Sequence, residues 1–582
     1  MCGIAGIVSL DPAGVSEQRL RAMTDALAHR GPDGEGFWMS DGGHIGLGHR
    51  RLSVIDLSAE GAQPMHFADG RYTIVYNGEI YNYLELRQRL VSAGYRFRSA
   101  SDTEVILALY DQKGVSCLEL LDGMFAFALY DAREQTLFCA RDRFGEKPFY
   151  YHHTPGKSFV FGSEIKALRA AGLPREPNPA MVYNYLSYGV LQNARDRSET
   201  FYHGVSRLEN GHFLLIRPNL RLEKYAWWHL QHAPDEGRMD DAKCADLFRT
   251  FLHRSVERRL RSDVRVGSSL SGGLDSTLIL HLIRECRGGS DPIPVFSARF
   301  PGFALDEGAH IQAAADREGA RRHDCFPDGA DCWAQLDRVF YHQEEPFGSA
   351  GIYAQFAVME AAKRAGVTVL LDGQGADEIL GGYPHYQPSG LKALLYNTGW
   401  LRYAKDAAAT ARQWTNPLFH RDFFGAYARH NYLPVIKDTG LNGALRYDLT
   451  QGGLSDLLRY ADRNAMAHGR EVRLPYLDHE LVAFLLALPA RAKIRADITK
   501  YLMRLSYEAV LPKRTDKVGF EPPQRSWMTE ATGIERMREG ARKLVRVGVL
   551  SKAYLERPPR PHDAYGQTGG SWAILMASMV YD

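Results

Sequence analysis

The chain lacks the features that mark secreted, membrane-spanning and nucleic-acid-binding proteins. Its 582 residues include only seven cysteines, none in a CxxC pair, so we expect no disulfide framework and a reducing compartment. No apolar run approaches the roughly 20 residues that span a bilayer, and the apolar start is too short for a signal peptide. The 71 basic residues nearly balance the 69 acidic ones, which argues against nucleic acid as the main partner. A soluble, cytoplasmic protein without a membrane partner is expected.

The hydrophobic pattern changes along the chain, and a chain this long usually forms two or more domains. Up to residue 215, short apolar segments such as "GIAGIVSL" and "GMFAFALYD" come in runs, with helical patterns near 16–29 and 82–93. Runs of strands predict an α+β fold with antiparallel sheets. Later, strand, loop and helix alternate, which predicts an α/β fold with a parallel sheet, and the tail from about 395 has almost wholly helical patterns. We therefore predict a domain over 2–215, a linker over 216–242 and a second domain over 243–582.

A glycine-rich stretch in the second half is typical of an anion-binding loop. "SLSGGLDST" (269–277) lies between a predicted strand and a predicted helix, so consecutive N–H groups can point into one concavity at a helix N-terminus. Asp275 falls in the first helical turn, where it can hold a cation, and Ser271 and Ser276 add hydroxyl groups. The alternative is a simple tight turn, which a lone SGG would usually be. The combined pattern predicts a phosphate site.

A second acidic loop follows another apolar strand. In "LLDGQGADEILGGY" (370–383), Asp377 and Glu378 are flanked by Gly375 and Gly381, which permit close approach of the backbone to a ligand. Open α/β sheets bind ligands at the carboxyl ends of their strands, and acidic side chains that face a triphosphate need Mg²⁺ between them. The alternative is a loop with solvated acids. The "GKS" at 156–158 is no P-loop, because a tyrosine stands where the motif requires its first glycine.

The chain opens with "MCGIAGIV", which places a thiol at position two. If Met1 is removed, Cys2 carries a thiol and a free α-amino group on adjacent carbons. Such an amine has a pKa of roughly 7.7–8.0, so a useful fraction is neutral and can accept the thiol proton. One residue then supplies both nucleophile and base. Taken alone, Cys2 is better explained as a small buried residue on a terminal strand.

Further motifs in the first half favour the catalytic interpretation. "RGPD" (30–33), "HRRLSVIDL" (49–57) and "SDTEVIL" (101–107) supply arginine, which grips a carboxylate, and aspartate, which holds an ammonium. "YNGEIYNY" (76–83) contains the Asn-Gly pair that is the strongest short-range signal of a hairpin turn. The same stretch offers the Asn77 amide and the Gly78 N–H as an oxyanion hole.

In their order along nearly the whole chain, these motifs resemble the glutamine-dependent asparagine synthetases. Residues 2–215 look like the family's class-II glutamine amidotransferase domain, an αββα fold of the N-terminal-nucleophile type. The resemblance implies that Cys2 attacks glutamine, forms a thioester and releases ammonia. It also implies a glutamine pocket made of Arg51 for the α-carboxylate, Asp102 for the α-amino group, Asn77, Gly78 and Glu79 around the amide, and residues 29–33 as a closing loop. "ARDRFGEKPFYY" (140–151) matches a further family motif, which we interpret as packing near the domain junction.

The second half resembles the family's ATP-pyrophosphatase domain, whose signature loop is SGGxDS. "LDGQGADE", "EVRLPYLDHELV" (471–482), "EEPFGS" (344–349) and "TKYLMR" (499–504) complete the set. The resemblance implies that a carboxylate attacks the α-phosphate of ATP, and that ammonia displaces AMP from the acyl-adenylate. The implied ATP-binding residues are Leu270, Ser271, Gly272, Gly273, Asp275, Ser276, Ala298, Asp372 and Gly373. Asp275 and Asp377 would hold Mg²⁺-pyrophosphate, and Lys500 would neutralise charge that develops on the phosphate.

The acceptor region departs from the family pattern SGEGxDE. The acid at the third position, thought to take a proton from the attacking ammonia, is Gln374 here, and the serine is Asp372. Glutamine is no general base. Either another group takes the proton, for which Asp372 and Glu345 are the candidates, or the substrate differs.

The expected activity is conversion of aspartate to asparagine with glutamine and ATP, in a protein that is a candidate homodimer. Ammonia released to water would be protonated, so a mostly apolar passage between the two sites is expected. One alternative is the same chemistry on a sugar acid, a peptide or a secondary metabolite. Another is an inactive binding homologue, which loss of Cys2, Asp275 or Lys500 would have marked; all three are present.

Overall fold

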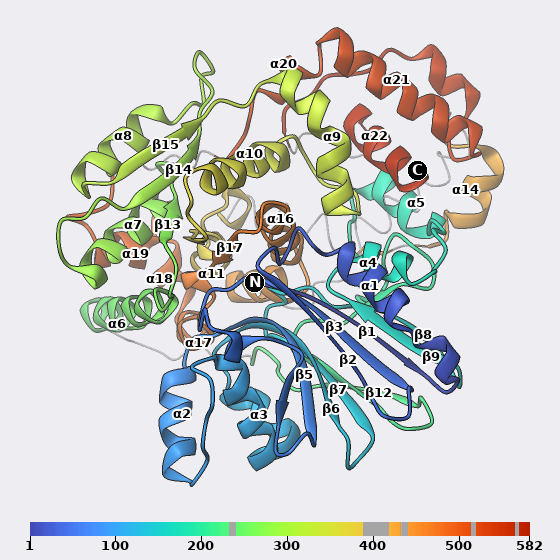
Figure 1. Ribbon diagram of the computed structural model, residues 1–582. Coiled ribbons are helices and arrows are strands. Elements are labelled where there is room, and N and C mark those ends of the chain that lie inside the picture. Colours follow the sequence, from blue (N-terminus) through green and yellow to red (C-terminus); the bar gives the residue numbers. More distant parts are fainter. Residues whose placement is uncertain (232–239, 388–417, 431, 434–439, 514–518, 565–569) are drawn as a thin grey trace.

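The computed structural model describes residues 1–231, 240–387, 418–430, 432–433, 440–513, 519–564 and 570–582 (Figure 1). Two antiparallel six-stranded sheets form the centre of the first half. The first has the order β10-β8-β9-β1-β3-β2, and the second has the order β12-β11-β7-β6-β5-β4. The strands are β1 Gly3–Ser9, β2 Gly34–Met39, β3 Ile45–Arg51, β4 Met65–Phe67, β5 Tyr72–Ile80, β6 Gly123–Asp131, β7 Thr136–Arg141, β8 Tyr150–Thr154, β9 Ser158–Gly162, β10 Ser206–Arg207, β11 His212–Ile216 and β12 Leu222–Ala226.

The two sheets face each other across an apolar layer to which Ile4, Leu47, Val75 and Leu214 contribute. Helices α1 (Glu17–Asp25) and α4 (Ile165–Ala170) contact the first sheet, and α3 (Asp102–Lys113), beside α2 (Tyr83–Ser92), contacts the second. A further helix, α5, spans Pro179–Tyr188. The predicted αββα arrangement is confirmed. Because layers cover both of its faces, β1 is buried along its whole length.

The first half differs from the sequence-based expectation in several details, among them helices α4 and α5, which were not predicted. The Asn-Gly pair forms no turn, since Asn77 and Gly78 lie inside β5, which runs unbroken to Ile80. Helix α3 was not anticipated, because Asp102 to Leu109 are all buried and no polar face marks the helical period. The segment predicted as a linker contains β12, which pairs with β11, so its first part extends the second sheet.

The second half contains a five-stranded sheet of order β15-β14-β13-β16-β17, in which every neighbouring pair is parallel. Its strands are β13 Val266–Ser269, β14 Pro294–Ala298, β15 Arg321–Cys325, β16 Val369–Leu371 and β17 Glu471–Arg473. The chain builds outward from β13 in one direction and then returns to the other side of β13 with β16. This reversal is the switch point at which open α/β sheets bind ligands.

Helices lie around the parallel sheet and form much of the described remainder of the second half (Figure 1). They are α6 Asp241–Arg259, α7 Leu274–Arg287, α8 Gly308–Arg317, α9 Gly329–Gln343, α10 Gly351–Arg364, α11 Ala376–Leu380, α14 Arg421–Tyr427, α15 Leu441–Thr450, α16 Leu454–Met466, α17 His479–Ala487, α18 Ala490–Lys493, α19 Tyr501–Ser506, α20 Gln524–Trp527, α21 Ala531–Arg546 and α22 Ser571–Val580.

The predicted helical C-terminal part is confirmed, but loops separate its helices in the described ranges and β17 joins the parallel sheet. Residues 395–417 of that prediction lie outside the described ranges. Within those ranges, no helix is both long enough and apolar enough to cross a membrane.

Candidate functional site

Cys2 is buried and directly precedes β1. The Cys2 N–H donates to Asn77 Oδ1 at 2.9 Å, and the sulfur lies 3.9 Å from the Leu52 carbonyl oxygen. Burial raises the pKa of the Cys2 thiol, although the nearby N-terminal ammonium opposes that shift. The thiol is therefore protonated at rest and needs a base before it can attack.

Two hydrogen-bond donors flank this thiol on β5. The side chain of Asn77 is fully buried, and its Nδ2 has no acceptor among the described residues. On the edge of β5 opposite β6, the N–H groups of Tyr76 and Ile80 donate hydrogen bonds to side chains. Gly78 is two residues from each of them, and N–H groups two residues apart in a strand point the same way, so the Gly78 N–H points out from the same edge. A Cβ on Gly78 would lie 2.2 Å from the Met124 carbonyl oxygen, so only glycine fits.

The charged residues of the predicted glutamine pocket lie around this edge of the sheet. The Arg51 guanidinium, at the end of β3, donates to the Ser58 carbonyl at 2.8 Å. Asp102 begins α3, and its carboxylate accepts from the Tyr76 hydroxyl at 2.8 Å. Burial raises the pKa of Asp102 and raises that of Glu79 well above its usual range. The structure thus brings together the side chains that sequence motifs far apart in the chain supplied.

Met1 lies at the junction of the two halves, where the N-terminus is marked in Figure 1. Its ammonium group is 3.0 Å from Glu471 Oε2 on β17, and both groups are fully buried. The α-amino group of Cys2 is therefore still in a peptide bond. The self-activated thiol predicted from the sequence requires removal of Met1.

Arg473 on β17 connects the two predicted sites. Its guanidinium contacts Glu471 at 2.6 Å and lies 3.5 Å from Glu79 in the glutamine pocket. Its own carbonyl oxygen accepts from the N–H of Asp372, the first residue of the acidic loop, at 3.0 Å. One fully buried residue therefore contacts a residue of each predicted pocket.

The two predicted phosphate-binding loops lie side by side at the switch point. The first loop follows β13, and inside it Ser271 N–H donates to the Ser276 hydroxyl at 3.2 Å. Gly272 has a φ of +78°, which favours glycine. A Cβ on Gly373 in the second loop would lie 2.9 Å from Asp275 Cβ and 3.0 Å from Ser276 N, so the loops touch.

A buried lysine joins the acids of these loops. Lys500 is 3% exposed, and its Nζ lies 2.6 Å from Asp275 Oδ1 and 2.6 Å from Asp377 Oδ1. Burial alone would lower the pKa of Lys500, but the two carboxylates raise it well above its usual range. Both carboxylates therefore converge on one cationic point. That donor set also suits Mg²⁺, which is commonly held by one or two carboxylates together with phosphate oxygens.

The other residues predicted around ATP and the acceptor divide into two groups. Leu270 and Ala298 are buried at the carboxyl ends of the adjacent strands β13 and β14, which fits an adenosine pocket beside the loop.

Gln374 lies in the acidic loop, and its Oε1 is buried without a donor among the described residues. Glu345, by contrast, contacts the first half, where both of its carboxylate oxygens accept from Arg207 at 2.9 and 3.1 Å. Glu345 is thus bound to the first half by a charge-assisted ion pair.

The sequence reasoning gave Glu378 no separate role. Burial and the adjacent Asp377 raise its pKa to about 7, and Tyr383 donates to its Oε1 at 2.8 Å. A carboxyl that titrates near neutral pH is suited to proton transfer. The signal in the sequence was the Asp-Glu pair itself, because one of two adjacent buried acids tends to remain protonated.

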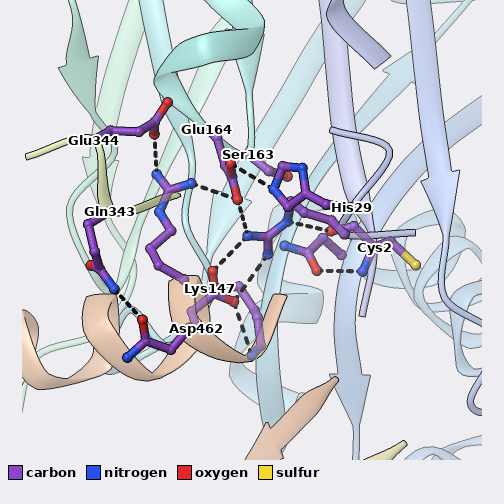
Figure 2. Close-up of polar contacts among 12 residues, drawn as sticks. Cys2, His29, Lys147, Ser163, Glu164, Gln343, Glu344 and Asp462 are labelled. Atoms are coloured by element: carbon purple, nitrogen blue, oxygen red, sulfur yellow. Dashed lines mark hydrogen bonds and ion pairs between the residues drawn. The ribbon is translucent and has the colours of Figure 1, made fainter. Parts of the chain in front are cut away.

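A buried network of charges joins the halves behind Cys2 (Figure 2). The Arg30 Nε–H donates to the Cys2 carbonyl at 3.0 Å, and its guanidinium contacts Glu164 at 2.7 Å and Asp462 at 2.8 Å. Arg463, next to Asp462 on α16, lies 2.8 Å from Glu164. Figure 2 shows the Cys2 sulfur pointing away from this network. The expected passage is mostly apolar, whereas these contacts between the halves are ionic, so the passage stays a prediction.

Comparison with known proteins agrees with this geometry. A family model described as a glutamine amidotransferase domain matches residues 1–228, and one described as asparagine synthase matches residues 247–581. "Asparagine synthetase [glutamine-hydrolyzing] 1" of Bacillus subtilis (strain 168) is 30% identical, over 91% of this chain and 88% of that protein. "Asparagine synthetase [glutamine-hydrolyzing] 3" of the same organism is 31% identical, over 88% and 85%. "Amidase chry2" of Gibberella zeae is 30% identical, over 90% of each chain.

Fold, site and matches define a two-part enzyme of the ligase class, in which a glutamine amidotransferase domain of the N-terminal-nucleophile type precedes a parallel-sheet synthetase domain. The chain belongs to the asparagine synthase family, whose members use glutamine and ATP.

Proposed function

We propose that this enzyme converts aspartate to asparagine, with glutamine as nitrogen donor and with AMP and pyrophosphate as products. The observation that carries the proposal is the convergence of Asp275, Asp377 and Lys500 between two loops at the sheet's switch point. Such a site suits adenylation, since it offers backbone N–H groups, a cation and two carboxylates to a triphosphate. The domain boundaries at 2–215 and 243–582 belong to this proposal, with the first domain extended by β12. The unpaired cysteines support a reducing, cytoplasmic location, and a homodimer stays a prediction.

At the first site, Cys2 acts as nucleophile once Met1 has been removed. Its α-amino group takes the thiol proton, the sulfur attacks the side-chain amide carbon of glutamine, and ammonia leaves as the thioester forms. The unpartnered Asn77 Nδ2 and the Gly78 N–H stabilise the oxyanion that develops on the amide oxygen. Arg51 and Asp102 orient the substrate through its α-carboxylate and α-amino groups.

At the second site, Asp275 and Asp377 would hold Mg²⁺, which supplies charge neutralisation to the leaving pyrophosphate when it is bound. Lys500 stabilises the negative charge that develops as the acceptor carboxylate attacks the α-phosphate. Leu270 and Ala298 enclose the adenosine, and the hydroxyl and N–H groups of residues 271–276 bind the phosphates. The buried Gln374 Oε1 accepts a hydrogen bond from the incoming ammonia and orients it, but a carboxyl must take the proton.

A second candidate function is the same chemistry on another carboxylate. Gln374 and Asp372 change the acceptor loop, and two relatives named amidases are each 30% identical over 90% of this chain. The glutamine site and the ATP site would be the same for both candidate functions. Only the acceptor pocket differs between them.

A panel of carboxylates separates the two candidates. Purified enzyme is incubated with ATP, glutamine and one carboxylate at a time, namely aspartate, glutamate, a sugar acid or a short peptide, and products are identified by mass spectrometry. We expect asparagine and AMP with aspartate, at least about tenfold above every other acceptor, because a site built for a charged substrate leaves its polar groups unpaired with the wrong one. Glutamine hydrolysis without asparagine, together with amide from another acid, would replace aspartate as the substrate.

A further inference from the structure

A small cavity lies at the junction of the halves, and none of the residues that line it was assigned to either predicted site. It has a volume of about 30 Å³, and its walls come from the 140–151 motif, from residues 192–210 and from α16. Five arginines contribute to these walls: Arg141, Arg197, Arg207, Arg459 and Arg463. The 140–151 motif had no function in the sequence reasoning beyond packing. The cavity is too small for ATP or glutamine.

Three of the five guanidinium groups have only neutral acceptors among the described residues. Arg141 donates to three carbonyl groups, those of Gly145, Lys147 and Leu208, at 2.6–2.8 Å. Arg459 likewise donates to the carbonyl groups of Gln343, Glu345 and Pro346. Arg197 donates to Asn210 Oδ1 and Ser455 Oγ, at 2.8 and 2.9 Å. Three positive charges are thus held together without an ion pair.

Among the described residues, the carboxyl groups in the cavity wall form no direct ion pair with these three arginines, although Glu209 Oε2 is buried there without a donor. Asp462 is held by Arg30, and Glu209 by Lys224 at 2.6 Å. Burial and the nearby Asp142 raise the pKa of Glu146 to about 8, against the opposing Lys147 and Arg259, so Glu146 is largely neutral at pH 7.

The further carboxyl groups around the cavity pair with its other two arginines or with an amide. Glu345 is bound by Arg207 and Glu344 by Arg463, while Asp456 accepts from the Gln192 amide. Arg141 still lies in the field of Asp142, and Arg459 in that of Glu345 and Asp456, so the wall holds arginines without a direct ion pair rather than a net excess of charge.

Two buried donors of this wall lack acceptors. Arg207 is 9% exposed, and its Nε–H, like that of Arg197, has no acceptor among the described residues. A buried N–H without an acceptor costs about 1–3 kcal/mol, so such groups usually mark a ligand or an ordered water. Burial, together with the adjacent Arg141 and Arg207, lowers the pKa of Arg197 to about 10. A negative charge placed between these arginines would relieve the repulsion between their guanidinium groups.

We propose that this cavity binds a small inorganic anion, a halide or a single phosphate, which joins α16 to the first half. The anion would accept from Arg197 and Arg207 and balance the charge of Arg141 and Arg459. Asp462 on α16 also lines the cavity and binds Arg30, and Arg30 in turn donates to the Cys2 carbonyl. Occupancy of the cavity therefore stabilises the contact that supports Cys2.

The test uses the full-length enzyme in gluconate buffer at constant ionic strength, into which chloride or phosphate is titrated. We expect a saturable rise in Tm of about 3 °C with one of the two anions, which identifies the class of ligand. Arg197→Gln should abolish the rise. The matched control is Arg364→Gln on α10, whose side chain is 65% exposed and pairs with Glu360, and it should keep the full rise.

Crystals of the unaltered enzyme test whether an anion occupies the cavity without the need for any variant. We expect an anomalous peak in the cavity after bromide substitution, or tetrahedral density there in phosphate. If both anions leave the Tm at its gluconate value and the cavity holds only water, the proposal is wrong. It is equally wrong if Arg197→Gln folds and keeps the whole rise.

Discussion

Replacement of Cys2 by alanine is expected to lower glutamine hydrolysis at least about a thousandfold, because removal of a catalytic nucleophile has effects of that size or larger. Glutamine-dependent amide formation should fall equally. Amide formation from ammonium salts should stay within about threefold of the unaltered enzyme, since the adenylating site is remote from the thiol and distant sites act independently. The measurement is glutamate release from glutamine beside amide formation from each nitrogen donor.

Cys286→Ala is the matched control for this variant. Cys286 is half-buried on α7, and its sulfur lies 3.5 Å from His253 Nε2, outside both predicted pockets. Its replacement should leave both activities unchanged. Glutamine hydrolysis that survives in the Cys2 variant would remove Cys2 as nucleophile and with it the whole scheme for the first half.

Lys500→Gln is expected to produce the opposite pattern. Loss of the ammonium that contacts Asp275 and Asp377 removes the charge that stabilises adenylation, and removal of one such stabilising group costs about 10²–10³ in rate. Amide formation should therefore fall by about that factor with glutamine and with ammonia alike. Glutamine hydrolysis should persist, which also shows that the first half remains folded.

Lys513→Gln serves as the control here, because Lys513 is exposed and lies a short distance further along the same chain segment. It should change neither activity. If the Lys500 variant loses only its glutamine-dependent activity and keeps the ammonia-dependent one, Lys500 acts in coupling the sites rather than in adenylation.

Much of both sites could be predicted from short motifs, for a physical reason. Glycine and acid residues that follow an apolar strand can only lie at the carboxyl edge of a sheet, so the loops at 269–277 and 370–383 were predicted to meet a ligand there. The structure places them in contact through Gly373 and Asp275. The chemistry proposed for Cys2 could likewise be predicted from its position, because a thiol beside a chain-terminal amine needs no residue from elsewhere in the chain to accept its proton.

The features that were missed depend on contacts distant in the sequence. Helix α3 is buried from Asp102 to Leu109, so no periodic pattern marked it, and the three-residue strand β17 pairs with β16, which lies about 100 residues earlier in the chain. The Asn-Gly pair predicted a turn, but pairing of β5 with β6 keeps it extended. The buried ion pairs of Arg30 and Arg463 join segments more than 100 residues apart, and no local signal marks them.

Arg473 gives the two-site account a physical link between its halves. The residue contacts Glu79 in one pocket and, through its backbone, Asp372 in the loop of the other. A shift of Glu79 on glutamine binding would therefore act directly on β17. Coupling between sites is carried by such contiguous packed contacts.

The most direct measurement follows labelled atoms through one reaction, with [amide-¹⁵N]glutamine as nitrogen donor and acceptor labelled with ¹⁸O in its carboxylate. The account predicts ¹⁵N in the new amide and one ¹⁸O in AMP, because the carboxylate oxygen stays with the α-phosphate when ammonia displaces it. Label that appears in inorganic phosphate beside ADP, or an amide without ¹⁵N, would contradict it.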